Sequence, residues 1–144
     1  MVNVQRTFTV DAPVDKVRAY LRDFANAEQW DPGTRKCTQV GTGPVVLGTE
    51  WDNTSKIAGI KTQLRYKLTR DDPDRVTLEG VNKTATSIDD ISIHPQGPAK
   101  TTVAYHAHVV FNGVAKLSDP VFGLVFKRLA DETQKQMTET LGAL

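Results

Sequence analysis

The chain has little of several residue types whose absence excludes whole classes of function. Cys37 is the single cysteine, so no disulfide forms within the chain, and no zinc-site spacing surrounds it. The 18 basic and 17 acidic residues nearly cancel, which leaves no charge excess to attract nucleic acid. No apolar run reaches transmembrane length, and the first residues lack a signal-peptide core. We therefore expect a cytoplasmic protein without a nucleic-acid partner or stable membrane insertion.

Motifs for catalysis and cofactor binding are also missing. The sequence has no dinucleotide fingerprint and no Ser-His-Asp arrangement, and the glycines of residues 41–48 precede a strand pattern rather than a helix. His106 and His108 share one face of a predicted strand, a geometry that can bind a metal. Apolar residues alternate with them, however, so these histidines should face solvent. We expect no metal site and no cofactor, and Cys37 is best interpreted as a small buried hydrophobe.

What is present is a regular pattern of strands followed by one long helix. With 144 residues and 39% hydrophobic content, the chain suits a single domain, residues 1–144, with a substantial core. Period-two alternation predicts about seven strands, at residues 2–10, 35–41, 48–57, 61–70, 75–81, 86–93 and 101–111. Most have one apolar side, which is typical of an antiparallel sheet with one solvated face.

Helical spacing appears in two places. Residues 11–26 place Val17, Leu21 and Phe24 on one face, with Asp11 as a plausible N-cap, and a corner follows at residues 31–33. A long helix should begin near a cap at Ser118 or Asp119. Its apolar stripe comprises Phe122, Val125, Phe126, Leu129, Thr133, Met137 and Leu141. A twisted antiparallel sheet wrapped around this helix would form an α+β fold.

The order and motifs resemble the helix-grip superfamily, which includes START-like lipid-transfer domains, the birch-pollen allergen group and bacterial polyketide cyclase/dehydrase-like (SRPBCC-type) proteins. The matching pieces are "FTVDAPVDKVRAYLRDFANAEQWDP", "VLGTEW", "GPAKTTVAYHAHVVFNG" and the terminal helix. One departure is Arg18, where family members often carry an aromatic residue. The resemblance implies a sheet and helix that enclose an apolar cavity, with two short helices after the first strand. It implies less about function, because one fold hosts many activities.

Trp30 poses the sharpest structural question in the sequence, since a large aromatic precedes the turn formed by Asp31, Pro32 and Gly33. By the resemblance it would stand at the cavity entrance, as a gate. The alternative is that its indole only packs the helix corner, because a tryptophan at a wet boundary suits either role.

Several polar residues should share an inward face with apolar ones. If Trp51 points inward, Asn53 and Ser55 do so too, either into a cavity or because their strand lies near a sheet edge. Tyr66 and Tyr105 lie on apolar strand sides, where each hydroxyl could meet a ligand or a local partner. Asp89 and Asp90 point to opposite faces, so one could be a general base, although acids at a strand end or turn are more common.

The first functional hypothesis is a carrier that encloses a lipophilic small molecule, such as a polyketide, lipid or isoprenoid-like compound. The predicted binding residues are Trp30 at the mouth and Trp51, Asn53, Leu64, Tyr66, Tyr105, Phe122, Phe126 and Leu129 along the lining. The second hypothesis is an enzyme of the polyketide cyclase/dehydratase type, although no strong acid/base pair is evident on the predicted inner face. A third is a protein-binding module of the same fold, and the sequence places no constraint on oligomeric state.

Overall fold

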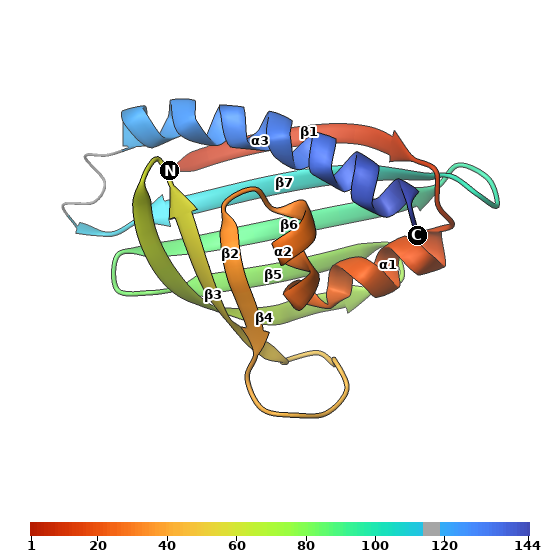
Figure 1. Cartoon of the computed structure of the whole chain (residues 1–144), viewed down its shortest axis with the longest axis horizontal. Coiled ribbons are helices and arrows are strands. Elements are labelled where there is room, and N and C mark those ends of the chain that lie inside the picture. Colours follow the sequence, from red (N-terminus) through yellow and green to blue (C-terminus); the bar gives the residue numbers. More distant parts are fainter. Residues whose placement is uncertain (114–118) are drawn as a thin grey trace.

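A single antiparallel sheet organises the chain. The computed structural model describes residues 1–113 and 119–144, and within these the sheet has seven strands in the order β1-β7-β6-β5-β4-β3-β2 (Figure 1). The strands are β1 (Val2–Val10), β2 (Thr34–Gln39), β3 (Glu50–Ile57), β4 (Ile60–Asp72), β5 (Arg75–Val81), β6 (Ala85–Pro95) and β7 (Thr101–Phe111). The order follows the sequence from β2 to β7, and β1 then closes against β7. This arrangement confirms the sheet predicted from the alternation.

Helices cover the inner side of this sheet. The short α1 (Val14–Arg22), the 3-10 helix η1 (Phe24–Asn26) and α2 (Ala27–Trp30) follow β1, and the long α3 (Asp119–Gly142) ends the chain. The long helix packs along β1 and against α2, while α1 lies against β5 and β6 (Figure 1). The helix-grip arrangement implied by the resemblance is therefore confirmed.

Helix boundaries differ from expectation at one capping position. Pro13, not Asp11, is the N-cap of α1, because Pro13 is the last residue with extended backbone before the helix. The cap expected at Ser118 or Asp119 lies outside the described residues and side chains. None of the helices in the described part of the chain combines the length and apolar content needed to cross a membrane.

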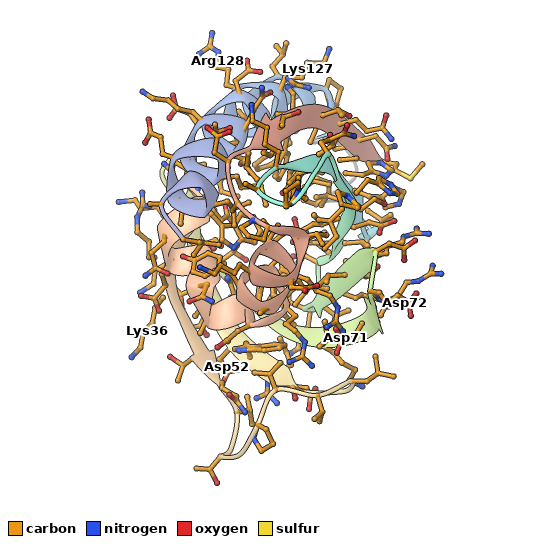
Figure 2. All side chains as sticks on the ribbon, turned by 90° about the vertical axis from the view of Figure 1, so that its right-hand side faces the viewer. Lys36, Asp52, Asp71, Asp72, Lys127 and Arg128 are labelled. Carbon is orange, nitrogen blue, oxygen red and sulfur yellow. The ribbon has the colours of Figure 1, made fainter. Side chains whose placement is uncertain are left out.

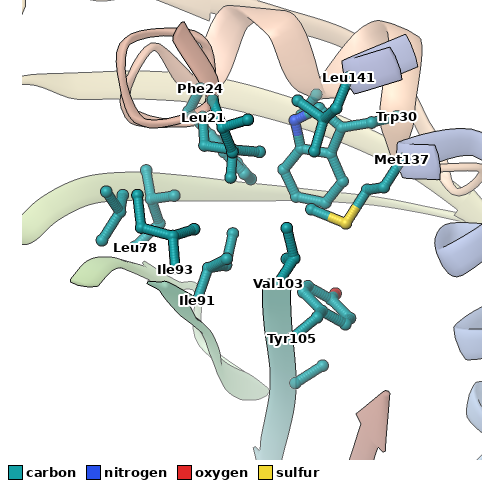
Figure 3. Packing of buried hydrophobic residues seen from close by; sticks show 14 of the residues in the cluster. Leu21, Phe24, Trp30, Leu78, Ile91, Ile93, Val103, Tyr105, Met137 and Leu141 are labelled. Atoms are coloured by element: carbon teal, nitrogen blue, oxygen red, sulfur yellow. The ribbon is translucent and has the colours of Figure 1, made fainter. Parts of the chain in front are cut away.

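Inward side chains at one end of the sheet form a solid hydrophobic core. Figure 3 shows Leu21 and Phe24 packed toward Leu78, Ile91 and Ile93. Met137 and Leu141 of α3 lie on the other side of this core, beside Trp30. These residues are almost fully buried. Val17, Leu21 and Phe24 all face this core, as their spacing predicted. The core occupies the end of the molecule where α1 and the last turns of α3 meet.

The outward faces of the same elements carry the polar residues. Lys127 and Arg128 project from the side of α3 that faces away from the sheet (Figure 2). On β7, His106 Nε2 and His108 Nδ1 lie 3.0 and 2.8 Å from the Asn3 Oδ1 atom of β1. Both histidines therefore lie on the outer face of the sheet, as predicted.

An ion-pair cluster attaches α1 to the sheet and accounts for Arg18. Arg18 Nη2 lies 2.7 Å from Asp71 Oδ1, and Arg22 Nη2 lies 2.6 Å from Asp71 Oδ2. Arg18 also donates to the Asp72 carbonyl, and Arg22 donates to the Val45 carbonyl in the loop before β3. Arg18 is thus a cation that contacts β4.

Replacing Asp71 by Asn is expected to lower the free energy of unfolding by about 1–2 kcal/mol, since the substitution removes the charge that two arginines share. The hydrogen bond from Arg22 lowers the pKa of Asp71 below its ordinary value of 3.8. A lowered pKa contributes stability above the ordinary value and loses it as the pH falls through the folded value. The difference between wild type and variant should therefore shrink in acid.

Urea unfolding of Asp71→Asn at pH 7 and pH 3 measures this effect. Asp72→Asn is the matched control, because Asp72 is the next residue of β4 and its carboxylate pairs with the exposed Arg70. An exposed pair of this kind contributes little, so the control should unfold almost as wild type does. Equal losses in both variants would contradict the anchoring role of Asp71.

Candidate functional site

The inward face of the sheet changes from solid core to open cavity partway along each strand. On β7, Val103 belongs to the core, whereas Tyr105, Ala107 and Val109 line the cavity. On β6 the change falls between Ile91 and Asp89. The cavity has a volume of about 330 Å³. The first half of α3 forms its remaining wall.

The cavity opens at the end of the molecule opposite the core. Its lining there includes Ile60, next to the β3–β4 turn, and Asn82 and Thr84, in the β5–β6 turn. Ile60 is 57% exposed and Thr84 is also exposed, so the cavity meets solvent at these turns. We call Ile60, Asn82 and Thr84 the mouth. In Figure 1 both turns lie on the left, near the start of α3.

Apolar side chains form the walls between the mouth and the interior. The Phe111 and Phe122 rings lie 5.2 Å apart, and the Phe122 and Phe126 rings lie 6.2 Å apart. The other apolar lining residues come from the sheet and from α3: Val4, Ile57, Leu64, Ala85, Ala107, Val109, Leu129 and Ala130. A surface of this kind stabilises a bound apolar group by removing it from water.

The inner end of the cavity is polar. We call Asp31, Ser55, Tyr66, Asp89 and Tyr105 the floor, because all five line the cavity and core residues lie beyond them. The Tyr105 hydroxyl donates a 2.7 Å hydrogen bond to Asp89 Oδ1. Burial raises the pKa of Asp89 to about 7, and the nearby charge of Asp31 adds to this increase. Near neutral pH, Asp89 can therefore either hold or release a proton.

The raised pKa of Asp89 also reduces stability at high pH. The folded pKa of about 7 lies above the ordinary value of 3.8. Between these values the native state holds a proton that the unfolded state has lost. The free energy of unfolding therefore falls as the pH rises from about 4 to about 7. This cost marks Asp89 as a functional candidate rather than a stabilising residue.

A hydrogen-bond chain runs from β3 to the other floor carboxylate. Ser55 Oγ donates to Asn53 Oδ1 over 2.7 Å, and Asn53 Nδ2 donates to Thr34 Oγ1 over 3.1 Å. Thr34 Oγ1 then donates to Asp31 Oδ2 over 2.9 Å, while the Gly33 N–H donates to Asp31 Oδ1 over 3.0 Å. Asp31 retains some accessible surface as a residue, yet protein atoms surround its carboxyl, and this burial raises its pKa.

Tyr66 fits into the floor because a glycine faces it. Gly80 of β5 is its register partner, and a Cβ atom at Gly80 would lie 2.6 Å from the Tyr66 ring. Burial raises the pKa of Tyr66 well above 10.0, and a hydrogen bond with Ser87 offsets part of that rise. Burial likewise raises the pKa of Tyr105. Both hydroxyls therefore keep their protons at neutral pH.

Most of the predicted lining residues do surround the cavity. Six of them contribute to its surface: Leu64, Tyr66, Tyr105, Phe122, Phe126 and Leu129. Trp51 and Asn53 point inward as expected, but they lie beyond the floor, within the core and the hydrogen-bond chain. Ser55, two residues nearer the mouth on β3, lines the cavity instead. Whether any of these residues binds a ligand stays a prediction.

Trp30 does not stand at the cavity entrance. Its side chain is fully buried, and it lies beside Val103, Met137 and Leu141, at the end of the molecule away from the mouth (Figure 3). Its ring also meets Phe24 edge-on, with 5.9 Å between the ring centres. The gate position is therefore wrong, and the alternative of corner packing describes Trp30 correctly. The last turns of α3 cover the indole and exclude it from solvent.

The sequence indicates the two floor carboxylates, Asp31 and Asp89, only in part. The sequence did place Asp89 and Asp90 on opposite faces, and Asp89 is the inward one. Asp90 faces outward and pairs with Arg75. The prediction that Asp89 and Asp90 are acids at a strand end or turn is wrong, because both lie within β6. For Asp31 the sequence indicates only a turn residue. Cys37 is buried as predicted, and burial raises its pKa to about 12.

Comparison with known proteins gives a family and a set of related folds. The family model described as "Polyketide cyclase / dehydrase and lipid transport" matches residues 1–144. A START superfamily protein from Mycobacterium smegmatis is 17% identical, covers 98% of this chain and 94% of its own, and has a TM-score of 0.73. The Zhui aromatase/cyclase from a Streptomyces species is 15% identical, with 96% and 92% covered and a TM-score of 0.75.

A Thermus thermophilus protein has a TM-score of 0.79 at 14% identity, covering 98% of this chain and 97% of its own. At such low identities these likenesses show the fold alone. No curated protein matches this sequence.

Proposed function

The chain belongs to the polyketide cyclase / dehydrase and lipid transport family, and on that premise we propose that it is a cytoplasmic, single-domain carrier of a lipophilic small molecule. The observation that carries the proposal is the cavity of about 330 Å³, with apolar walls, a solvent-connected mouth and a polar floor. This volume lies within the range typical of small-molecule sites. The polyketide, lipid or isoprenoid-like class remains our proposal for the ligand.

The physical basis is the division between walls and floor. Apolar walls provide about 25 cal/mol for each Å² of ligand surface removed from water. The floor supplies a few fixed polar groups that orient one end of the ligand, which apolar contact alone does not do. Leu64, Phe122, Phe126 and Leu129 would contact the apolar body, while Tyr66 and Tyr105 would lie near its polar end.

The test is a ligand-retention experiment. The purified protein is incubated with a lipophilic extract of its source cells, and both the retained compounds and the free pool are profiled by mass spectrometry. The carrier proposal predicts that a compound is retained unchanged and released on denaturation. Absence of any retained compound would contradict it.

A second candidate function is a cyclase or dehydratase acting in the same cavity. It is favoured by the Asp89–Tyr105 pair, which supplies a buried acid/base candidate on the inner face of the sheet. A carboxyl with a pKa of about 7 has nearly the ideal value for proton transfer at neutral pH. In the retention experiment this candidate predicts that a compound is consumed and that a cyclised or dehydrated product appears in the free pool.

A further inference from the structure

Several hydrogen-bond donors around the floor carboxylates already donate within the protein. Ser55, Asn53 and Thr34 donate in sequence toward Asp31, and the Gly33 N–H donates to it as well. On the other side of the cavity the Tyr105 hydroxyl donates to Asp89 Oδ1. A ligand that accepts a hydrogen bond from any of these donors would therefore have to break an existing one.

The Asp89 carboxylate, in contrast, has acceptor positions that no protein donor in the described part of the chain uses. A carboxylate has about four acceptor positions on its two oxygens. Among the described residues Asp89 receives one hydrogen bond, on Oδ1, and none reaches Oδ2. Asp89 lines the cavity, so this oxygen is available there to a donor on a bound molecule. A ligand that carries a donor can therefore hydrogen-bond to Oδ2 without displacing a hydrogen bond within the protein.

The charges of the lining residues also favour a ligand that carries hydrogen-bond donors. Two acidic residues, Asp31 and Asp89, line the cavity, and no lysine, arginine or histidine is among the described residues that do so. The two carboxyls interact, because the charge of Asp31 contributes to the shifted pKa of Asp89. A fatty acid or phosphate that placed its anionic group at this floor would meet like charge. A cation there would supply the countercharge that the described lining lacks.

We propose that the polar end of the ligand is an ammonium group on an apolar body, which donates hydrogen bonds to Asp89 and is attracted by Asp31. This inference rests on the proposed function, and it narrows the ligand class from lipophilic molecules in general to lipophilic amines. An ammonium carries up to three donors and one positive charge, so it matches both the spare acceptors and the missing cation. The apolar walls then hold the rest of the molecule.

The proposal predicts a direction for the pH dependence of binding. The titratable groups around Asp89 are Tyr105 on β7, Tyr66 on β4 and Asp31 after α2, and both tyrosines stay protonated at neutral pH. A bound cation stabilises the ionised form of Asp89, so it lowers the pKa of that carboxyl. Affinity for the amine should therefore rise as the pH increases through about 7, with release of a proton on binding below that pH.

Three probes of equal chain length test the head group directly. Octylamine, octanol and octanoate are titrated into the purified protein by calorimetry at pH 6 and pH 8. At pH 8 octylamine should bind at least about tenfold more tightly than octanol, and octanoate more weakly than octanol, because one close charge interaction contributes on that order. Equal or tighter binding of octanol or octanoate would overturn the inference, as would amine binding that weakens from pH 6 to pH 8.

A variant and its matched control test whether Asp89 is the residue that binds the amine. Asp89→Asn keeps the shape and an acceptor for Tyr105, so octylamine affinity should fall to the level of octanol while octanol affinity changes less than about twofold. Asp90→Asn is the matched control, since Asp90 is the next residue of β6 and faces outward toward Arg75. An equal loss in both variants would overturn the role of Asp89. If none of the three probes binds to wild type, the proposed function itself is contradicted.

Discussion

Ala107→Phe is expected to abolish ligand binding while the protein stays folded. Ala107 lies between Tyr105 and Val109 on the inner face of β7, and its register partners are Asp89 on β6 and Val4 on β1. A phenyl ring at this position would project into the cavity just above the floor. It would occupy the space that the polar end of a ligand needs.

The expected effect on stability is small because the new ring enters empty space rather than packed core. Filling a cavity with apolar atoms adds burial, and misfit costs of about 1–3 kcal/mol arise where no space exists. The free energy of unfolding should therefore change by less than about 1 kcal/mol, while the affinity for octylamine or for a retained natural ligand falls at least about a hundredfold. Calorimetry and urea unfolding measure the two quantities separately.

Ala104→Phe provides the matched control for this prediction. Ala104 lies on the same strand, but its register partners Thr7 and Ser92 belong to the outer face of the sheet. A ring there faces solvent, so ligand affinity should remain that of wild type. Retained binding in Ala107→Phe would mean that the ligand lies outside this cavity.

Trp30→Ala is expected to cost about 3–5 kcal/mol of unfolding free energy, the range for removing a large aromatic from a core. The indole is fully buried among residues of η1, β7 and α3, so its loss leaves a void that spans three elements. Urea unfolding followed by circular dichroism measures the change. The far smaller loss expected of a residue at an entrance would contradict the core position of Trp30.

Trp30→Phe separates packing from polarity at the same site. Among the described residues the indole Nε1 atom has no hydrogen-bond partner, so its replacement by a phenyl ring removes a buried donor along with some volume. We expect a loss below about 1.5 kcal/mol, much smaller than for alanine. Binding of octylamine should be unchanged in Trp30→Phe, because Trp30 does not line the cavity.

The strands were predictable because each one separates two different environments. In β7, Val103, Tyr105, Ala107 and Val109 alternate with polar or half-buried neighbours along the whole strand, so period two is unmistakable. In β6 the pattern is weaker because Ile88 lies on the outer face while Ile91 lies inward. That mixture hid the inward position of Asp89.

The floor could not be predicted from local pattern because it is assembled from distant parts of the chain. Asp31 follows α2, while Asp89 and Tyr105 come from two neighbouring strands. Its proton chemistry arises from desolvation, which depends on what covers each carboxyl rather than on the residues beside it in sequence. Trp30 shows the same limit, since Met137 and Leu141, more than a hundred positions later, bury it.

The separation of core and cavity along each strand has a consequence for how such a protein can change over evolution. Residues of the solid core gather at the end near α1, and residues that only line the cavity gather toward the mouth. Substitutions at well-separated sites that share no partners have nearly additive effects on stability. Mutations toward the mouth can therefore accumulate and alter which molecule is accepted, while the core's contribution to the free energy of unfolding stays nearly unchanged. One scaffold can in this way give rise to descendants with different ligands.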